Sequence, residues 1–205
     1  AVFGSTSVTV GVSSRASTDK GSRSLTTITC SGVKWKDYDE NKLQMMGCLA
    51  AYDFMKKLQP ADVKSDEYIG IDLKDDMDGT KELEYKIADL LALEQPIKTA
   101  ESFYKSFSKG DGNGILALSD TSYINQPALL QILELNRQVD SAFAGGQRKM
   151  ELSGLNSKPD MVNGENAQQI NLTEKHNGLK VNYLIYIDKQ SKKIIGVSYD
   201  SKKSE

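Results

Sequence analysis

Residues 96–111, Pro-Ile-Lys-Thr-Ala-Glu-Ser-Phe-Tyr-Lys-Ser-Phe-Ser-Lys-Gly-Asp, decide how the second half of the chain is interpreted. Apolar side chains recur in this stretch every three or four residues, which predicts a helix with one buried face. Pro96 suits the first turn of such a helix, and Gly110 suits the left-handed position that ends it. The stripe on the buried face is largely aromatic and consists of Ile97, Ala100, Phe103, Tyr104 and Phe107.

A second helix and a set of antiparallel strands are predicted after this aromatic helix. Pro127 suits a first-turn position, and an apolar stripe runs from there to Gly145-Gly146, where the helix should stop. The apolar period then changes from about 3.6 to about 2, and Asn177-Gly178 predicts a tight hairpin because both residues tolerate positive φ. The predicted strands contain residues 148–152, 168–173, 179–187 and 195–199.

This order of elements resembles the NTF2-like superfamily and, more narrowly, is similar to its small exported bacterial members. The resemblance covers residues 96–200. It implies an α+β fold in which helices pack on a curved antiparallel sheet and form a cone that usually holds a pocket. One fold hosts many functions, so an activity has to be argued from the site. The positions that carry the resemblance are Ala100, Phe103, Tyr104, Phe107, Gly110 and Asp111.

The 205 residues are enough for two small domains, each of which can bury its own core. Because the residue before a proline resists helical geometry, one helix should end at Gln95-Pro96 and another should begin there. We therefore predict a small α+β domain over residues 1–94. The resemblance implies that residues 95–205 form an NTF2-like domain.

The first domain is predicted to contain, in order, strand, strand, helix, strand and helix. The two leading strands should form a hairpin with a long exposed loop at residues 13–24, where almost nothing is apolar. Asp37 and Glu40 indicate the start of the first helix, Pro60 its end, and Thr80 can cap the second helix. The predicted strands lie at residues 7–12, 25–33 and 67–73, and the apolar face of the second helix is Leu83, Ile87, Leu90 and Leu91.

Charge and hydropathy argue against nucleic-acid binding and against an integral membrane segment. The chain has 26 basic and 28 acidic side chains, which gives a formal net charge of −2. No segment concentrates basic residues with interleaved aromatics, so nucleic acid is not expected as a partner. No apolar run approaches the roughly 20 residues that cross a bilayer, so no integral membrane segment is predicted.

The start of the chain suggests where the protein works. It begins at Ala1 rather than Met, so an upstream segment has been removed, either during cloning or by a signal peptidase that cleaves after small residues. Residues 1–29 are rich in Ser and Thr, as in exported mature proteins. We expect an extracytoplasmic location, in the periplasm, in the cell envelope or outside the cell, with the signal peptide removed.

Cys30 and Cys48 are the two cysteines of the chain. Their spacing is unlike that of a redox pair or a zinc pair. In an oxidising compartment, a disulfide between them would join a strand to the following helix and stabilise the fold by about 3 kcal/mol. The alternative is that both are buried small hydrophobic residues. We predict the disulfide.

Three stretches look like metal sites, and none has the required ligands. Met45 and Met46 lie next to Cys48 without a nearby His, which indicates a core face of the helix. The acidic turns at residues 75–79 and 110–114 each place a Lys where the first ligand of a calcium loop is needed. No metal and no cofactor is predicted.

Enzymes of the superfamily that the chain resembles place a carboxylate base, or an Asp-His pair, inside the cone opposite Tyr or Trp donors. Here the one histidine, His176, precedes the predicted turn and should be exposed. Glu151 and Glu174 fall at polar positions of alternating strands, which predicts two solvated carboxylates. No catalytic residue is therefore predicted.

Tyr183, Tyr186 and Tyr199 are the candidate ligand-binding residues, because their hydroxyls can donate to a ligand in a pocket. Their rings also suit a sheet that is covered by helices. Core packing is the stronger interpretation for Tyr183 and Tyr199. Tyr186 lies on the other face of its strand and is the better candidate for a binding surface.

The leading hypothesis is an exported, non-enzymatic protein that binds a small ligand or a cell-envelope protein through its NTF2-like domain, with a homodimer through the sheet as a further expectation. The first alternative is a cofactor-independent enzyme of the isomerase or cyclase kind. The second alternative is a subunit of a secretion or envelope assembly. A pocket with an ionisable group favours the enzyme, a pocket without one favours the ligand binder, and a filled cone with an exposed apolar sheet favours the assembly subunit.

Overall fold

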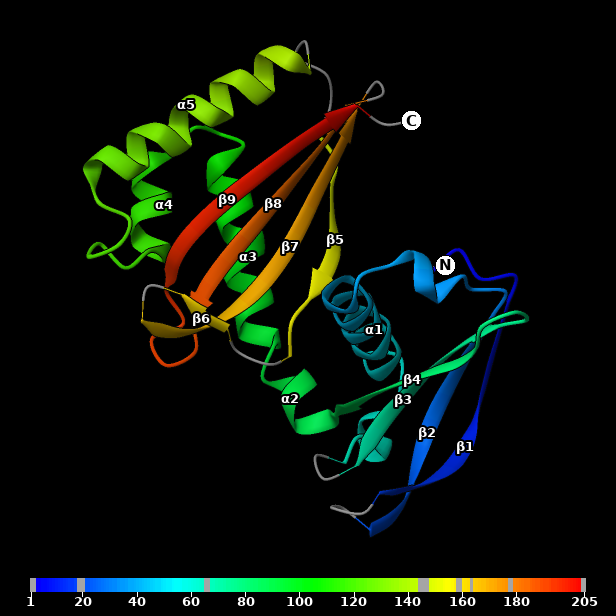
Figure 1. The fold of residues 1–205 in the computed structure, drawn as a ribbon. Coiled ribbons are helices and arrows are strands. Elements are labelled where there is room, and N and C mark those ends of the chain that lie inside the picture. The colour runs from blue at the N-terminus through cyan, green and yellow to red at the C-terminus, as the bar shows by residue number, and fades with distance from the viewer. Residues whose placement is uncertain are drawn as a thin grey trace. The chain divides into compact units, whose positions relative to one another are not determined.

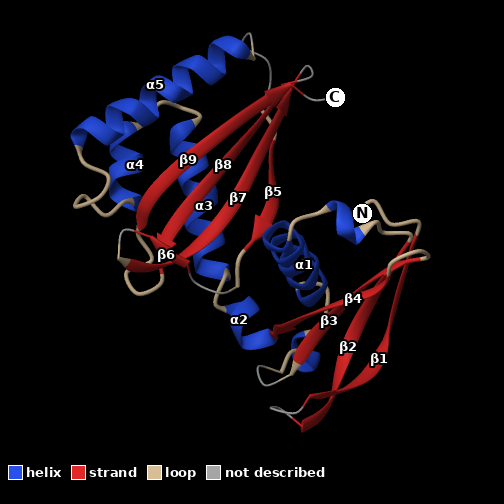
Figure 2. Cartoon of the chain, in the orientation of Figure 1, coloured by secondary structure: helices blue, strands red, loops and turns tan. Residues whose placement is uncertain are grey.

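The computed structural model describes residues 3–17, 21–64, 67–143, 148–157, 160–162, 164–176 and 179–203. The chain divides into two compact units, Ala1–Ala92 and Leu93–Glu205. Each unit combines helices with its own sheet, as Figures 1 and 2 show, so the chain is an α+β protein as predicted. Whether each unit folds alone stays a prediction.

The first unit is built on a four-stranded sheet in the order β1-β2-β3-β4. β1 and β2 pair antiparallel, as predicted, and so do β3 and β4, whereas β2 and β3 run parallel. Parallel neighbours need a crossover connection, and α1 provides it. The elements are β1 (Ser7–Ser17), β2 (Gly21–Ser31), α1 (Glu40–Met55), β3 (Tyr68–Asp75), β4 (Gly79–Lys86) and α2 (Ile87–Leu91).

Helix α1 packs on β3 and β4 and closes the core of the first unit. It begins at Asp39, whose side chain accepts a hydrogen bond from the Lys42 amide at 2.7 Å. The Tyr85 hydroxyl of β4 donates to the Gln44 carbonyl at 2.7 Å, which fixes the helix against the sheet. The apolar residues buried in this core include Leu43, Leu49, Met55, Ile69, Ile71, Leu73 and Leu83.

Gly47 is the point of closest approach between α1 and the sheet. A Cβ atom at this position would lie 2.5 Å from the Tyr85 hydroxyl oxygen and 2.6 Å from Leu83 Cδ1. We expect Gly47→Leu to lower the free energy of unfolding of the first unit by at least about 1–3 kcal/mol, because the side chain overpacks the core. Trp35 fluorescence during urea denaturation measures this loss, and Asn41→Leu on the exposed side of the same helix is the control.

An unchanged urea midpoint for Gly47→Leu would show that α1 can move away from the sheet at no cost. The helical glycine would then have no packing reason. The control separates this effect from the gain in helix propensity that both substitutions bring.

The helix predicted from Thr80 to Leu91 is wrong. Residues 79–86 form strand β4, and only Ile87–Leu91 is helical. The Asp75 carboxylate accepts from the amides of Met77 and Asp78 at 2.7 and 3.1 Å, and Gly79 adopts φ of +77°, so the chain turns back onto β3. Leu83 and Tyr85 then share the buried face at the period of a strand.

The long loop predicted at residues 13–24 is also wrong. β1 and β2 continue through it in an unbroken register as far as Ser17 opposite Gly21, and residues 18–20 lie outside the described part. The prediction bounded the strands by their apolar residues. Backbone ladder hydrogen bonds need no apolar side chain, and Ser and Thr are compatible with them.

The second unit is an antiparallel sheet with three helices. The strand order is β5-β7-β8-β9, and β6 pairs with β7. His176 pairs with Leu179, which confirms the predicted hairpin, although residues 177 and 178 lie outside the described part. The elements are α3 (Glu94–Phe107), α4 (Gly112–Leu118), α5 (Gln126–Ala142), β5 (Met150–Leu155), β6 (Asp160–Val162), β7 (Glu165–His176), β8 (Leu179–Asp188) and β9 (Ile194–Lys203).

Helix α3 packs against β7, and α4 and α5 pack against α3 and each other. Gly110 has φ of +66°, which confirms the predicted left-handed position after the aromatic helix. The sheet face toward α3 carries buried apolar residues, whereas the other face carries polar ones such as Asn171 and Asn182. The buried face holds Ile170, Leu172, Val181, Tyr183 and Ile185.

None of the helices in the described ranges has both the length and the apolar character needed to cross a bilayer.

Candidate functional site

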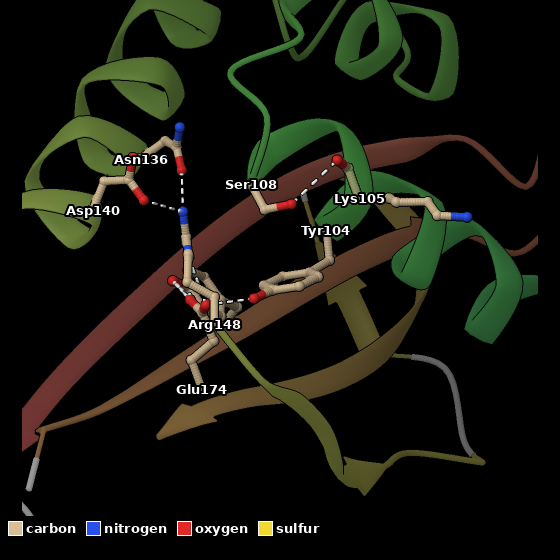
Figure 3. A network of polar contacts seen from close by, with 8 residues as sticks. Tyr104, Lys105, Ser108, Asn136, Asp140, Arg148 and Glu174 are labelled. Carbon is tan, nitrogen blue, oxygen red and sulfur yellow. Dashed lines mark hydrogen bonds and ion pairs between the residues drawn. The ribbon is translucent and has the colours of Figure 1, made fainter. Parts of the chain in front are cut away.

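A buried ionic cluster occupies the space between α3, α5 and the sheet of the second unit. At its centre, Arg148 forms an ion pair with Glu174 (Figure 3). The Glu174 side chain is 0% exposed and the Arg148 side chain 9% exposed. The Glu174 cluster, as we call it, comprises Tyr104, Asn136, Asp140, Arg148, Glu174 and Tyr183.

The pleat of β7 places Glu174 inside the unit. Alternate residues of a strand share a face, so Glu174 points to the same side as Ile170 and Leu172. Its neighbours on the flanking strands are Val181 of β8 and Met150 of β5. No bulge interrupts the pairing of β7 with β8, and the carboxylate is therefore directed at α3.

Four donors surround the Glu174 carboxylate. Oε1 accepts hydrogen bonds from Arg148 Nε at 2.7 Å and from the Tyr104 hydroxyl. Oε2 accepts from Arg148 Nη2 at 3.0 Å and from the Tyr183 hydroxyl at 2.5 Å. A carboxylate has about four lone-pair sites, so each of them is occupied in this arrangement.

Arg148 connects the carboxylate to helix α5. Its Nη1 donates to Asn136 Oδ1 at 2.6 Å and to Asp140 Oδ1 at 3.3 Å. Asp140 is largely exposed and forms an ion pair with Arg148, so the cluster reaches solvent at this residue. Figure 3 shows Arg148 lying between Glu174 and these two helical residues.

Aromatic rings enclose the ion pair. The Arg148 guanidinium lies 5.3 Å from the ring centre of Phe107 and 5.9 Å from that of Tyr104. Phe107 stacks on Phe103 with ring centres 5.8 Å apart and meets Tyr183 edge-on at 5.3 Å. These rings fill the space beside the carboxylate and exclude water from it.

The protonation of the cluster follows from its contacts. Burial by itself raises the pKa of Glu174, but the hydrogen bonds from Arg148, Tyr104 and Tyr183 outweigh burial, and the pKa lies below its usual value. Burial and the hydrogen bond to the carboxylate raise the pKa of Tyr104 and of Tyr183. At neutral pH the cluster therefore holds an ionised Glu, an ionised Arg and two neutral phenols.

This arrangement can hold the helices on the sheet, but it is poorly suited to proton transfer. A general base needs a free lone pair within hydrogen-bond distance of the substrate and a pKa near the working pH. The Glu174 lone pairs are occupied, and its pKa is shifted away from neutrality. The chemistry of the cluster is that of a structural ion pair.

The three tyrosines predicted as ligand contacts do not converge on one site. Tyr183 is 1% exposed and its hydroxyl belongs to the Glu174 cluster, which confirms core packing for this residue. Tyr199, its partner in register on β9, is 52% exposed, so core packing is wrong for Tyr199. Tyr186 lies on the opposite face of β8, where its ring packs over Gly196. Whether Tyr186 or Tyr199 contacts a ligand stays a prediction.

The predicted positions of the two glutamates need one correction. Glu151 is half exposed and lies 3.5 Å from both Lys149 and Lys175, which confirms a solvated carboxylate. Glu174 is fully buried, so the prediction of a solvated side chain is wrong. Its residue type predicts exposure, whereas its place in the alternation of β7 determines its burial. The side chain of His176 lies outside the described residues.

The structure also corrects the predicted disulfide, because Cys30 and Cys48 are both buried and no disulfide joins them. Cys30 lies on β2, and Cys48 lies on α1. Cys48 is close to Tyr85 of β4: burial is the main cause of the raised pKa of Tyr85, and the neighbouring Cys48 raises it further. β3 lies between β2 and β4, so the backbones of β2 and β4 are about 10 Å apart. A disulfide needs Cα atoms within about 7 Å. The alternative of two small buried residues fits this placement.

Sequence reasoning missed Arg148, Asn136 and the role of Tyr104. A signal was present for two of them. Arg148 has the same parity as Met150 and Leu152, which face the core side of the predicted strand, and Asn136 is a polar residue within the apolar stripe of α5. A buried polar residue on each of two packed elements indicates that they satisfy each other.

A shallow groove lies on the outside of the second unit. It has a volume of about 320 Å³ and is lined by α3, α4 and the turn between them, with Lys105 on α3 and with Lys109 and Asp111 in the turn. It is open to solvent and separate from the Glu174 cluster. In the described ranges, no three His, Cys, Asp or Glu side chains come together in a way that could hold a metal ion.

Comparison of the chain with protein-family models, with curated protein sequences and with solved structures finds no match. The relationship to the NTF2-like superfamily therefore stays a prediction, and the function has to be argued from the geometry of the two units.

Proposed function

We propose that this chain is an exported, non-enzymatic protein that binds a protein partner of the cell envelope through its surface. In this proposal the second unit is an NTF2-like domain whose interior serves as a rigid support. The first unit is fused to it as a second binding module. The location outside the cytoplasm is part of the proposal and follows from the composition of residues 1–29.

The saturation of Glu174 is the observation that carries the proposal. Arg148, Tyr104 and Tyr183 supply a donor to every lone pair of this buried carboxylate. An isomerase or cyclase would need a carboxylate that is free to take up a proton from its substrate. A paired carboxylate of this kind stabilises or specifies a fold.

The packing around the cluster favours a protein partner over a small ligand. Phe103, Phe107 and Tyr183 are buried and in contact with one another between α3 and the sheet. Sites for small molecules are usually enclosed apolar cavities, and this space is occupied by side chains. A macromolecular partner can instead bind to the outer surface, where Leu184 and Tyr186 are partly exposed.

Glu174→Gln tests the proposal because it keeps the shape of the side chain and removes its ability to take up a proton. An enzyme that used this base would lose about 10²–10⁴-fold in rate. We expect the folded Glu174→Gln protein, present at the normal level, to restore the phenotype of a strain that lacks the gene. Glu151→Gln is the matched control on the surface. Loss of function in a folded Glu174→Gln protein would overturn the proposal.

The same strains identify the type of partner. Chemical cross-linking of the intact cell envelope should give a heavier covalent complex that contains this chain and a different protein. A small-ligand binder would give no such complex and would instead release a bound molecule on denaturation, which mass spectrometry detects.

A further inference from the structure

Strand β1 is an edge strand whose residues 7–14 lack the usual protection, since its one charged residue, Arg15, lies near its end. Among the described residues it pairs with β2 alone, and its register runs from Ser7 opposite Ser31 to Ser17 opposite Gly21 without a bulge. Residues 1–14 contain no charged side chain and no proline. An edge strand leaves backbone N–H and C=O groups open to pairing, and proteins usually blunt it with charges, prolines or bulges.

Other edges in the described ranges carry these protective features. β4, at the opposite edge of the first sheet, has a charged residue at half of its positions, namely Lys81, Glu82, Glu84 and Lys86. In the second sheet, the pairings of the edge strands β5 and β9 both contain a register shift. β1 differs from these strands because its residues 7–14 have neither a charge nor a register shift.

An apolar stripe lies along β1. Val8, Val10 and Val12 point to one face and are 52%, 56% and 78% exposed. In register, Val8 lies opposite Cys30 and Val10 opposite Ile28, both of which are buried. The exposed valines therefore lie on the same face of the first sheet that α1 covers at β3 and β4.

We infer that β1 pairs with β1 of a second copy of this chain, so that two first sheets join into one continuous sheet. The pairing is antiparallel about a two-fold axis. Val10 lies opposite Val10 of the second copy, and Val8 lies opposite its Val12. Every valine of the stripe then meets a valine across the new interface.

The sequence of β1 is self-complementary in this register. Moving one strand by two residues leaves one valine of each chain opposite a serine or a residue outside the stripe, and moving it by one residue puts the valines on opposite faces. A two-fold interface brings identical residues together, so a charge near the axis would face itself. The absence of charge from residues 1–14 removes that repulsion.

This inference does not depend on the proposed function. It concerns the β1 edge of the first sheet, whereas the homodimer expected from the sequence is assigned to a sheet without a named strand. An envelope partner and a second copy can bind the same chain at different surfaces.

Sedimentation velocity over a range of concentrations tests the pairing. We expect a dimer for the unchanged chain and about 100-fold weaker association for Val10→Lys, which places two like charges together at the axis. Met77→Lys, an equally drastic change at an exposed residue of the same unit, should leave the dimer intact. A chain that stays monomeric at about 100 µM overturns the inference, because another segment or partner must then cover β1.

Introduced cysteines test the register. Val10→Cys should give an intermolecular disulfide between the two introduced thiols on mild oxidation, because paired residues lie about 5 Å apart. Val12→Cys should not, since its two copies lie about 13 Å apart in this register. Peptide mapping by mass spectrometry identifies the linkage. A dimer that survives Val10→Lys, or that cross-links through Val12→Cys instead, would use another surface or register and overturns the inference.

Discussion

Glu174→Ala should lower the free energy of unfolding of the second unit by about 3–5 kcal/mol, because it leaves the Arg148 guanidinium buried without its counter-ion. Arg148 would keep only Asn136 and Asp140 as acceptors. The two phenols that donate to the carboxylate would lose their acceptor as well. Glu151→Ala on the surface of the same sheet should change the stability by no more than about 0.5 kcal/mol.

The choice of probe matters because the chain has two units. The one tryptophan, Trp35, lies in the first unit and reports on that unit alone. Hydrogen exchange of the β7 and β8 backbone amides, followed by mass spectrometry, reports on the second unit and gives its opening free energy. Two transitions in urea would also be expected for two independent units.

A double change separates the ion pair from simple packing. Arg148→Met with Glu174→Leu removes both charges and keeps apolar volume, so the double variant should be about 1–3 kcal/mol more stable than the sum of the single losses predicts. If Glu174→Ala costs no more than Glu151→Ala, the carboxylate does not hold the cluster together. Glu174 would then have no structural role, although donors surround its carboxylate.

The sequence allowed the framework of the second unit to be predicted, because its signals are local. The aromatic period of residues 96–107, the left-handed Gly110 and the Asn177-Gly178 hairpin each depend on residues close in the chain. The same is true of β8, where Val181, Tyr183 and Ile185 alternate. Local periodicity and turn chemistry are the most reliable guides that a sequence offers.

The Glu174 cluster could not be predicted in the same way because its contacts are long-range. Arg148 and Glu174 are 26 residues apart, and Tyr104 and Glu174 are 70 apart. Their meeting depends on the register of β5 against β7 and on the rotation of α3, which no local pattern fixes. Residue type alone therefore predicts a solvated glutamate, although the parity of Glu174 with Ile170 and Leu172 indicates the opposite.

The wrong prediction of a helix at residues 80–91 arises because the sequence there fits two periods. Glu82 and Lys86 are spaced as a helical pair, and Leu83, Ile87 and Leu90 are spaced as a helical face. The same residues also support alternation, with Leu83, Tyr85 and Ile87 on one side. Pairing with β3 along eight residues decides between these two patterns, and it is a tertiary contact.

Arg148→Met should reverse the pH dependence of stability of the second unit. In the unchanged protein, the folded pKa of Glu174 lies below its unfolded value. Its ionised form therefore contributes stability that is present above the unfolded pKa of about 4.3 and is lost as the pH falls through the folded pKa. Acidification from neutrality should weaken the second unit.

The variant should behave in the opposite way. Without Arg148, only the hydrogen bonds from Tyr104 and Tyr183 oppose the effect of burial on Glu174, and we expect burial to outweigh them, so its folded pKa should rise above the unfolded value. The variant should be less stable than the unchanged protein by about 3–5 kcal/mol at neutral pH, because it holds a buried carboxylate without its counter-ion. As the pH falls, protonation removes that charge, and the difference between the two proteins should shrink.

Arg137→Met is the matched control for this reversal. Arg137 also forms a two-point contact with a carboxylate, at 2.9 and 2.8 Å from Glu134, and that contact keeps the pKa of Glu134 low at about 2. Both side chains are well exposed, so solvent screens the pair and its loss should change the stability little at any pH. Opening free energies of the β7 amides, measured at several pH values, distinguish the two variants. Parallel pH profiles for Arg148→Met and the unchanged protein would contradict the prediction, because they would show that Arg148 does not lower the pKa of Glu174. Profiles of opposite slope require a buried carboxylate whose pKa is set by its partner.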